Sequence, residues 1–77
     1  MAEDKQRRLV GAQDIVRKFK ISYATLNNYT DMGLLNVLAR KNRMRMYDFD
    51  DVRGRLETIT RMINEGYTLR VICKLLR

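Results

Sequence analysis

A short amphipathic helix is predicted near the start of the chain. Ile15, Val16 and Phe19 recur at the spacing of one helical face. They indicate a helix from Ala12 to about Phe19, for which Gly11 can serve as the N-cap. The folded part of the chain is therefore expected to begin with a helix that has one apolar side.

A second helix is expected after a very short turn. Ser22 favours a helix start and Gly33 a helix end, so the helix covers YATLNNYTDM between them. Only about three residues separate it from the first helix. A helix, a short turn and a second helix in this order resemble a helix-turn-helix.

A β-hairpin is predicted in the segment NVLARKNRMRMY, from Asn36 to Tyr47. Two short strands fit this segment, with the turn around Lys41 and Asn42. Arginine and methionine alternate in the second half: Arg43, Met44, Arg45, Met46. Because successive side chains of a strand point to opposite faces, we expect the methionines to lie on the helices and the arginines to face outward. This hairpin is named the wing.

Two more helices are predicted after the wing. Asp48 can cap the third, with Asp51 in its first turn, and Gly66 can end it. Its apolar side chains recur with a helical period: Phe49, Val52, Leu56, Ile59, Ile63. Thr68 can cap the fourth helix. Its apolar side comprises Leu69, Ile72, Leu75, Leu76. The predicted fold is mainly α with a small β-hairpin, a winged helix-turn-helix with four helices.

Positive charge is concentrated in the first part of the chain. The net charge is +7, and residues 1–47 hold ten Lys or Arg against four Asp or Glu, whereas residues 48–77 hold six against five. A one-sided positive field is typical of a protein with a polyanionic partner such as nucleic acid, and less often of one that binds an anionic membrane. A basic face that serves only solubility is the alternative.

The composition offers little support for catalytic, metal or membrane chemistry. The chain has no His, a single cysteine (Cys73) and no Gly-rich phosphate loop, so we expect no enzyme activity, metal site or cofactor. No apolar run is long enough to span a membrane, and no secretory signal is recognised, so the cytoplasm is the expected compartment. Residues 1–8 are predicted to form a flexible arm ahead of one domain at 9–77.

Three stretches resemble the DNA-binding domain of the MerR-type transcription regulators. Where that family commonly reads VSxxTLRYYxxxGLL, this chain has ISYATLNNYTDMGLL, from Ile21 to Leu35. Where it reads RxYxxxDVxxL, this chain has RMYDFDDVRGRL, from Arg45 to Leu56. Where it reads GxSLxEI, this chain has GYTLRVI, from Gly66 to Ile72. The resemblance covers roughly residues 9–76 and implies transcription regulation by dimers that bind inverted repeats.

The chain departs from the family pattern in its second predicted helix. Asn27 and Asn28 stand where the family has Arg and its first Tyr, although Tyr29 is kept. Lys20 occupies a turn position where glycine is frequent. Family members usually continue into a long dimerising helix and an effector domain, and this sequence contains neither. A small-molecule or metal sensing role is therefore not carried over from the family, and we expect a chain that is mostly monomeric off DNA and pairs, if at all, on its operator.

The candidate DNA-binding residues lie on the first two predicted helices and on the wing: Arg17, Lys18, Tyr23, Ala24, Asn27, Asn28, Tyr29, Arg40, Lys41, Arg43, Arg45, Tyr47. Asn amides can pair with adenine in the major groove or contact phosphates, whereas a merely solvated helix face is the alternative. The wing cations are expected on the DNA backbone or in the minor groove. For Tyr29 and Tyr47, ring packing and a hydroxyl contact with DNA both remain open. Met44, Met46 and Met62 are expected to fill the core.

The predicted function is sequence-specific binding of double-stranded DNA in transcription regulation, with the second helix in the major groove. Two alternatives fit the same residues. One is an excisionase-like recombination accessory protein, and the other is a protein-interaction module whose arginines bind an acidic partner.

Overall fold

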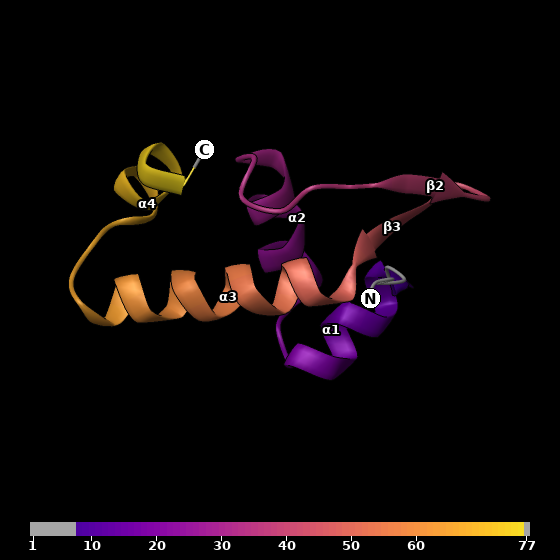
Figure 1. Ribbon diagram of the computed structural model, residues 1–77, viewed down its shortest axis with the longest axis horizontal. Coiled ribbons are helices and arrows are strands. Elements are labelled where there is room, and N and C mark those ends of the chain that lie inside the picture. Colours follow the sequence, from indigo (N-terminus) through magenta and orange to yellow (C-terminus); the bar gives the residue numbers. More distant parts are fainter. Residues whose placement is uncertain (1–7, 77) are drawn as a thin grey trace, which may run out of the picture.

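The computed structural model describes residues 8–76 and shows four helices and a three-stranded antiparallel sheet (Figure 1). In chain order the elements are β1 (Leu9–Gly11), α1 (Ala12–Phe19), α2 (Tyr23–Asp31), β2 (Ala39–Lys41), β3 (Met44–Asp48), α3 (Phe49–Asn64) and α4 (Leu69–Leu76). The wing, β2 and β3, projects away from the helices at one end, and α4 lies at the other. The predicted fold class, mainly α with a winged helix-turn-helix, is confirmed.

The helix boundaries follow from local hydrogen bonds. Ser22 caps α2, since its hydroxyl accepts from the Thr25 N–H at 3.0 Å. The Asp48 carboxylate caps α3 by accepting from the N–H groups of Asp50 at 2.9 Å and Asp51 at 3.2 Å. Lys20 ends α1 in the left-handed region, with φ 57°. The starts of α2 and α3 are the ones that the sequence predicts.

The sheet contains one strand more than the predicted hairpin. β3 lies in the centre, between β2 and β1, and Val10 of β1 pairs with Tyr47. The predicted arm, residues 1–8, lies outside the described residues except for Arg8, whose carbonyl accepts from the Phe49 N–H at 2.9 Å. The sheet therefore joins the start of the chain to the start of α3.

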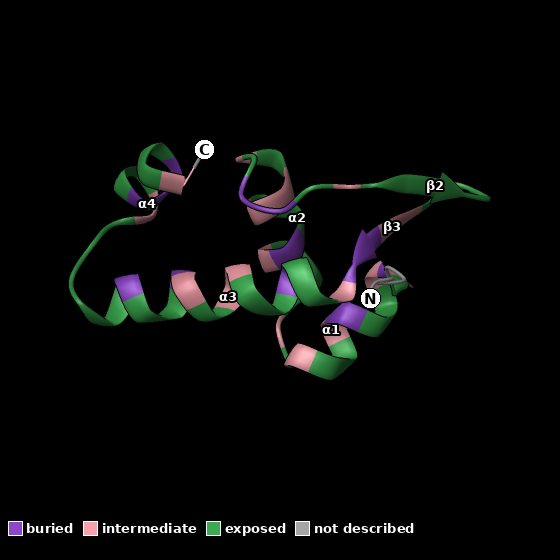
Figure 2. Cartoon of the chain, in the orientation of Figure 1, coloured by how far each residue is buried: buried purple, intermediate pink, exposed green. Residues whose placement is uncertain are grey.

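The core consists of two neighbouring clusters, and α3 contributes to both (Figure 2). The cluster nearer the wing comprises Ile15, Leu26, Leu35, Tyr47 and Val52. The cluster nearer α4 comprises Leu34, Ile59, Met62, Ile72 and Cys73. Tyr29 of α2 packs against both. The core thus fixes α2 against α3 and leaves the outer face of α2 in solvent.

Three apolar positions differ from the sequence prediction. Ile63 is 42% exposed and Leu75 is 60% exposed, although the helical period placed both on buried faces. Met62 fills the core as predicted, whereas Met44 is 47% exposed. Cys73 is buried, and its thiol donates to the Met32 carbonyl at 3.0 Å. A helical period gives the direction of each side chain but does not show where the neighbouring element ends, so the errors at Ile63 and Leu75 fall at the ends of helices, whereas Met44 lies in β3.

Candidate nucleic-acid interface

The outer face of α2 carries four of the predicted contact residues. Tyr23, Ala24, Asn27 and Asn28 are all exposed, while Leu26 on the opposite face is completely buried. The buried leucine fixes the rotation of α2, so the two carboxamides are presented to solvent.

The tip of the wing is a tight turn with an unusual backbone. Asn42 and Arg43 both have positive φ, 52° and 70°, as a two-residue hairpin turn of type I′ requires. The turn therefore lies one residue later than predicted. Asn tolerates this conformation, but it costs an arginine about 1 kcal/mol or more relative to glycine. Arg43 therefore holds an exposed cation at the tip of the wing at some cost in stability.

Like charges face each other across the wing. Arg40 of β2 is the direct partner of Arg45 of β3, and Lys41 is the partner of Met44. Arg40, Lys41 and Arg43 are exposed, and Arg45 is half-buried. Like charges directly opposite in a sheet are destabilising. A polyanion bound to this surface would relieve that repulsion.

Arg45 contacts α2, which corrects the prediction that all the arginines of the wing face outward. Its Nη2 donates a hydrogen bond to Oδ1 of Asn27. The Arg45 guanidinium also lies over the Tyr47 ring, 6.0 Å from the ring centre. The face of β3 that carries Arg45 and Tyr47 is therefore the face turned toward α2. The sequence predicted the alternation of side chains along β3 correctly, but it assigned Arg45 to the wrong face of the strand.

Tyr47 lies in the core, so of its two expected roles the structure shows packing. It is 0% exposed, and its hydroxyl lies 2.9 Å from the Thr30 hydroxyl. Thr30 donates its own proton to the Leu26 carbonyl at 2.8 Å, so Tyr47 is the donor in the shared bond. Thr30 was missed by the sequence reasoning, because no short-range pattern links it to Tyr47, 17 residues away. The pair joins β3 to α2 beneath the exposed face.

A hollow of about 280 Å³ lies where α1, α2 and the wing meet. It is lined by Ala12, Gln13, Tyr23, Arg43, Met44 and Arg45. Three of the predicted residues, Tyr23, Arg43 and Arg45, therefore lie around one concave surface, although they come from two elements. α1 begins at this hollow, and its N-cap, Gly11, provides no side-chain hydrogen bond to the first turn.

Arg17, Lys18 and Tyr29 lie elsewhere. Arg17 and Lys18 line a second hollow, on the side of α1 that faces Arg8 and Phe49. Tyr29 is half-buried and lines a groove between the turn after α1 and helix α3. The structure thus divides the predicted residues into one group around α2 and the wing and a smaller group outside it.

Among residues 8–76, no group of three His, Cys, Asp or Glu side chains is placed to hold a metal ion. None of the helices in that range has the length and apolar character that crossing a membrane requires.

The family model described as MerR HTH family regulatory protein matches residues 12–77. Searches of curated proteins and of solved structures return no match.

Proposed function

Because the chain belongs to the MerR HTH family of regulatory proteins, we propose that it binds double-stranded DNA in a sequence-specific manner and regulates transcription. The family is a regulatory one, and its model spans both helices of the helix-turn-helix, the wing and the last two helices. A regulator of this kind acts in the cytoplasm of a bacterium, where its operator lies.

In this proposal α2 enters the major groove. The exposed carboxamide of Asn28 is free to donate to N7 and accept from N6 of an adenine. Asn27 already accepts a hydrogen bond from Arg45, so its amide nitrogen remains as a donor to a base or a phosphate. Tyr23 and Ala24 lie at the start of the same face and contact the groove wall.

The wing binds the flanking backbone or minor groove through Arg40, Lys41, Arg43 and Arg45. The single observation that carries the proposal is the hydrogen bond between Arg45 and Asn27. It ties the most enclosed cation of the wing to the outer face of α2, so both approach DNA as one surface. The positive φ of Arg43 supports the same assignment. Arg17 and Lys18 of α1 extend the phosphate contacts beyond that surface.

A selection from randomised duplexes tests this function. The wild-type protein is expected to enrich one operator half-site, arranged as an inverted repeat if two chains bind together. Enrichment should disappear when Asn28 and Arg45 are both replaced by Ala. Two results would contradict the proposal. One is that the protein enriches no sequence, and the other is that it binds DNA no more tightly than it binds an acidic polypeptide of equal charge.

A further inference from the structure

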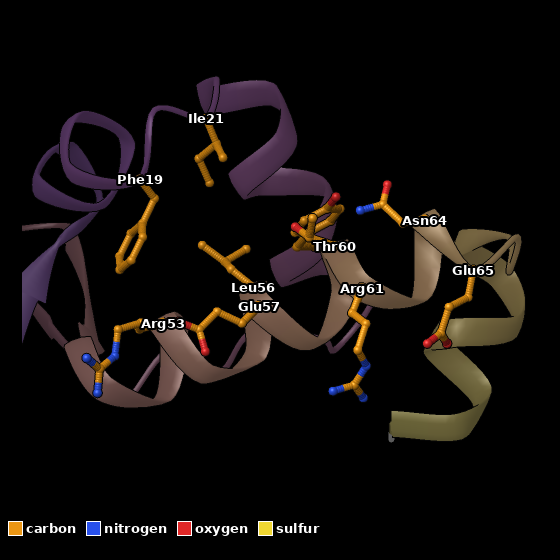
Figure 3. Close-up of a pocket in the computed structure, with 10 residues that line it drawn as sticks. Phe19, Ile21, Arg53, Leu56, Glu57, Thr60, Arg61, Asn64 and Glu65 are labelled. Carbon is orange, nitrogen blue, oxygen red and sulfur yellow. The ribbon is translucent and has the colours of Figure 1, made fainter.

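Four charged side chains of alternating sign form a row along α3. Arg53, Glu57, Arg61 and Glu65 follow one another at four-residue spacing, and all four are exposed. Residues four apart are neighbours on a helix surface. Figure 3 shows these side chains along α3, beside the groove that Phe19 and Ile21 also line. We call this row the charged ridge of α3.

The charged ridge makes few ion pairs within the described part of the chain. In the part of the chain that the structure describes, Arg53 makes an ion pair with Asp50 at 3.6 Å, but Glu57, Arg61 and Glu65 make none. The ridge carries no net charge, so it differs from the basic surface around α2 and is poorly suited to DNA phosphates.

We propose that the charged ridge of α3 is a self-association surface, on which a second copy of this chain packs its own α3 in the antiparallel sense. Reversing the row +, −, +, − gives −, +, −, +. In an antiparallel pair, Glu57 therefore faces Arg61 of the second copy, and Arg53 faces Glu65 of that copy. The contact is its own complement, as the interface of a two-fold dimer must be. Packing of such four-residue rows crosses two helices at about −50°, so the Glu57–Arg61 contacts lie at the centre.

Two features beside the ridge fit the α3 helix of a second copy. A groove lined by Phe19, Ile21 and Leu56 runs along the ridge and offers apolar surface to the stems of long side chains (Figure 3). Gly54 lies three residues before Glu57 on the outer side of α3, and a Cβ built there meets nothing within 4 Å. A glycine inside a helix is less stable than alanine, but it allows a second helix backbone to approach closely.

The association is expected to be weak, because exposed ion pairs contribute little individually. Wild-type protein should be monomeric at micromolar concentration and pair at roughly 0.1–1 mM and low salt. Sedimentation equilibrium without DNA measures this directly, so the result is independent of the proposed DNA binding. A wild-type protein that stays monomeric over this range would overturn the proposal.

Charge exchange at the centre of the ridge gives the decisive test. Glu57→Arg and Arg61→Glu should each weaken association by roughly tenfold or more, although they shift the net charge in opposite directions. An equimolar mixture of the two variants should associate again, because every central contact is then between opposite charges. The double variant Glu57→Arg/Arg61→Glu should also regain wild-type association.

Asp31→Arg is the matched control, since it makes the same charge change as Glu57→Arg at an exposed position outside the ridge. It should leave association unchanged within about twofold. The proposal is overturned if this control weakens association as much as Glu57→Arg. It is also overturned if neither the mixture nor the double variant recovers.

Discussion

Nη2 of Arg45, on the central strand of the sheet, donates a hydrogen bond to Oδ1 of Asn27 on the exposed face of α2. The two residues lie 18 positions apart in the sequence. The contact couples the wing to the helix that is proposed to read DNA. It also means that neither side chain can be altered without changing the surroundings of the other.

The first prediction follows from this coupling. Asn27→Ala releases the Arg45 guanidinium, and Arg45→Ala leaves the Asn27 carboxamide without its partner, so each single change should weaken DNA binding. The double variant should lose less than the two single losses combined. A double-mutant cycle on DNA affinity should give a coupling energy of about 0.5–3 kcal/mol. Additive losses would mean that the two side chains act on DNA independently.

The second prediction uses the strained tip of the wing. Arg43→Gly should raise the free energy of unfolding by about 1 kcal/mol, because glycine adopts a φ of 70° without steric cost. The same change should weaken DNA binding, because it removes a cation. Urea denaturation and a DNA titration measure the two effects. If binding is retained in the stabilised protein, Arg43 makes no contact with DNA.

The third prediction separates sequence reading from phosphate binding on α2. Asn28 is exposed, so Asn28→Ala should change stability by no more than about 0.5 kcal/mol. It should remove about 1–3 kcal/mol of discrimination at one base pair of each half-site while affinity for random duplex barely changes. Selection from randomised operators would show one flattened position. An unchanged preference would assign sequence reading to other side chains or to DNA shape.

The fourth prediction concerns Tyr47 as a structural residue. Tyr47→Phe removes the donor to Thr30 in the core and should cost about 1 kcal/mol of stability. The affinity for DNA should stay the same, because the hydroxyl is buried and bound to Thr30. A loss of DNA affinity in the folded variant would restore a DNA contact to Tyr47.

The features that the sequence predicted correctly are local ones. Ser22 and Asp48 bond to N–H groups two or three residues away, so the cap residues reveal the starts of α2 and α3. β1 has only three residues and no alternating pattern, and it exists because it pairs with β3, far along the chain. The exposure of Leu75 was missed because it depends on where neighbouring elements end.

The candidate site also contains features that the sequence predicted and features that it did not. The exposed face of α2 could be predicted from its position opposite Leu26. The direction of Arg45 could not, because the alternation of a strand names two faces without showing which one meets the helices. The burial of Tyr47 could not be predicted for the same reason, since Tyr47 shares the face of Arg45 and so enters the core.

The salt dependence of DNA binding tests the central claim, that α2 and the wing form one DNA-binding surface. Affinity for random duplex should be measured at nanomolar protein over a range of salt concentrations. Arg43→Ala/Arg45→Ala should reduce the log–log slope by about 1.8, because each lost phosphate contact removes about 0.9. Arg53→Ala/Arg61→Ala, with the same change of charge on the ridge of α3, should leave the slope unchanged. Equal slopes for wild type and the wing variant would contradict the account.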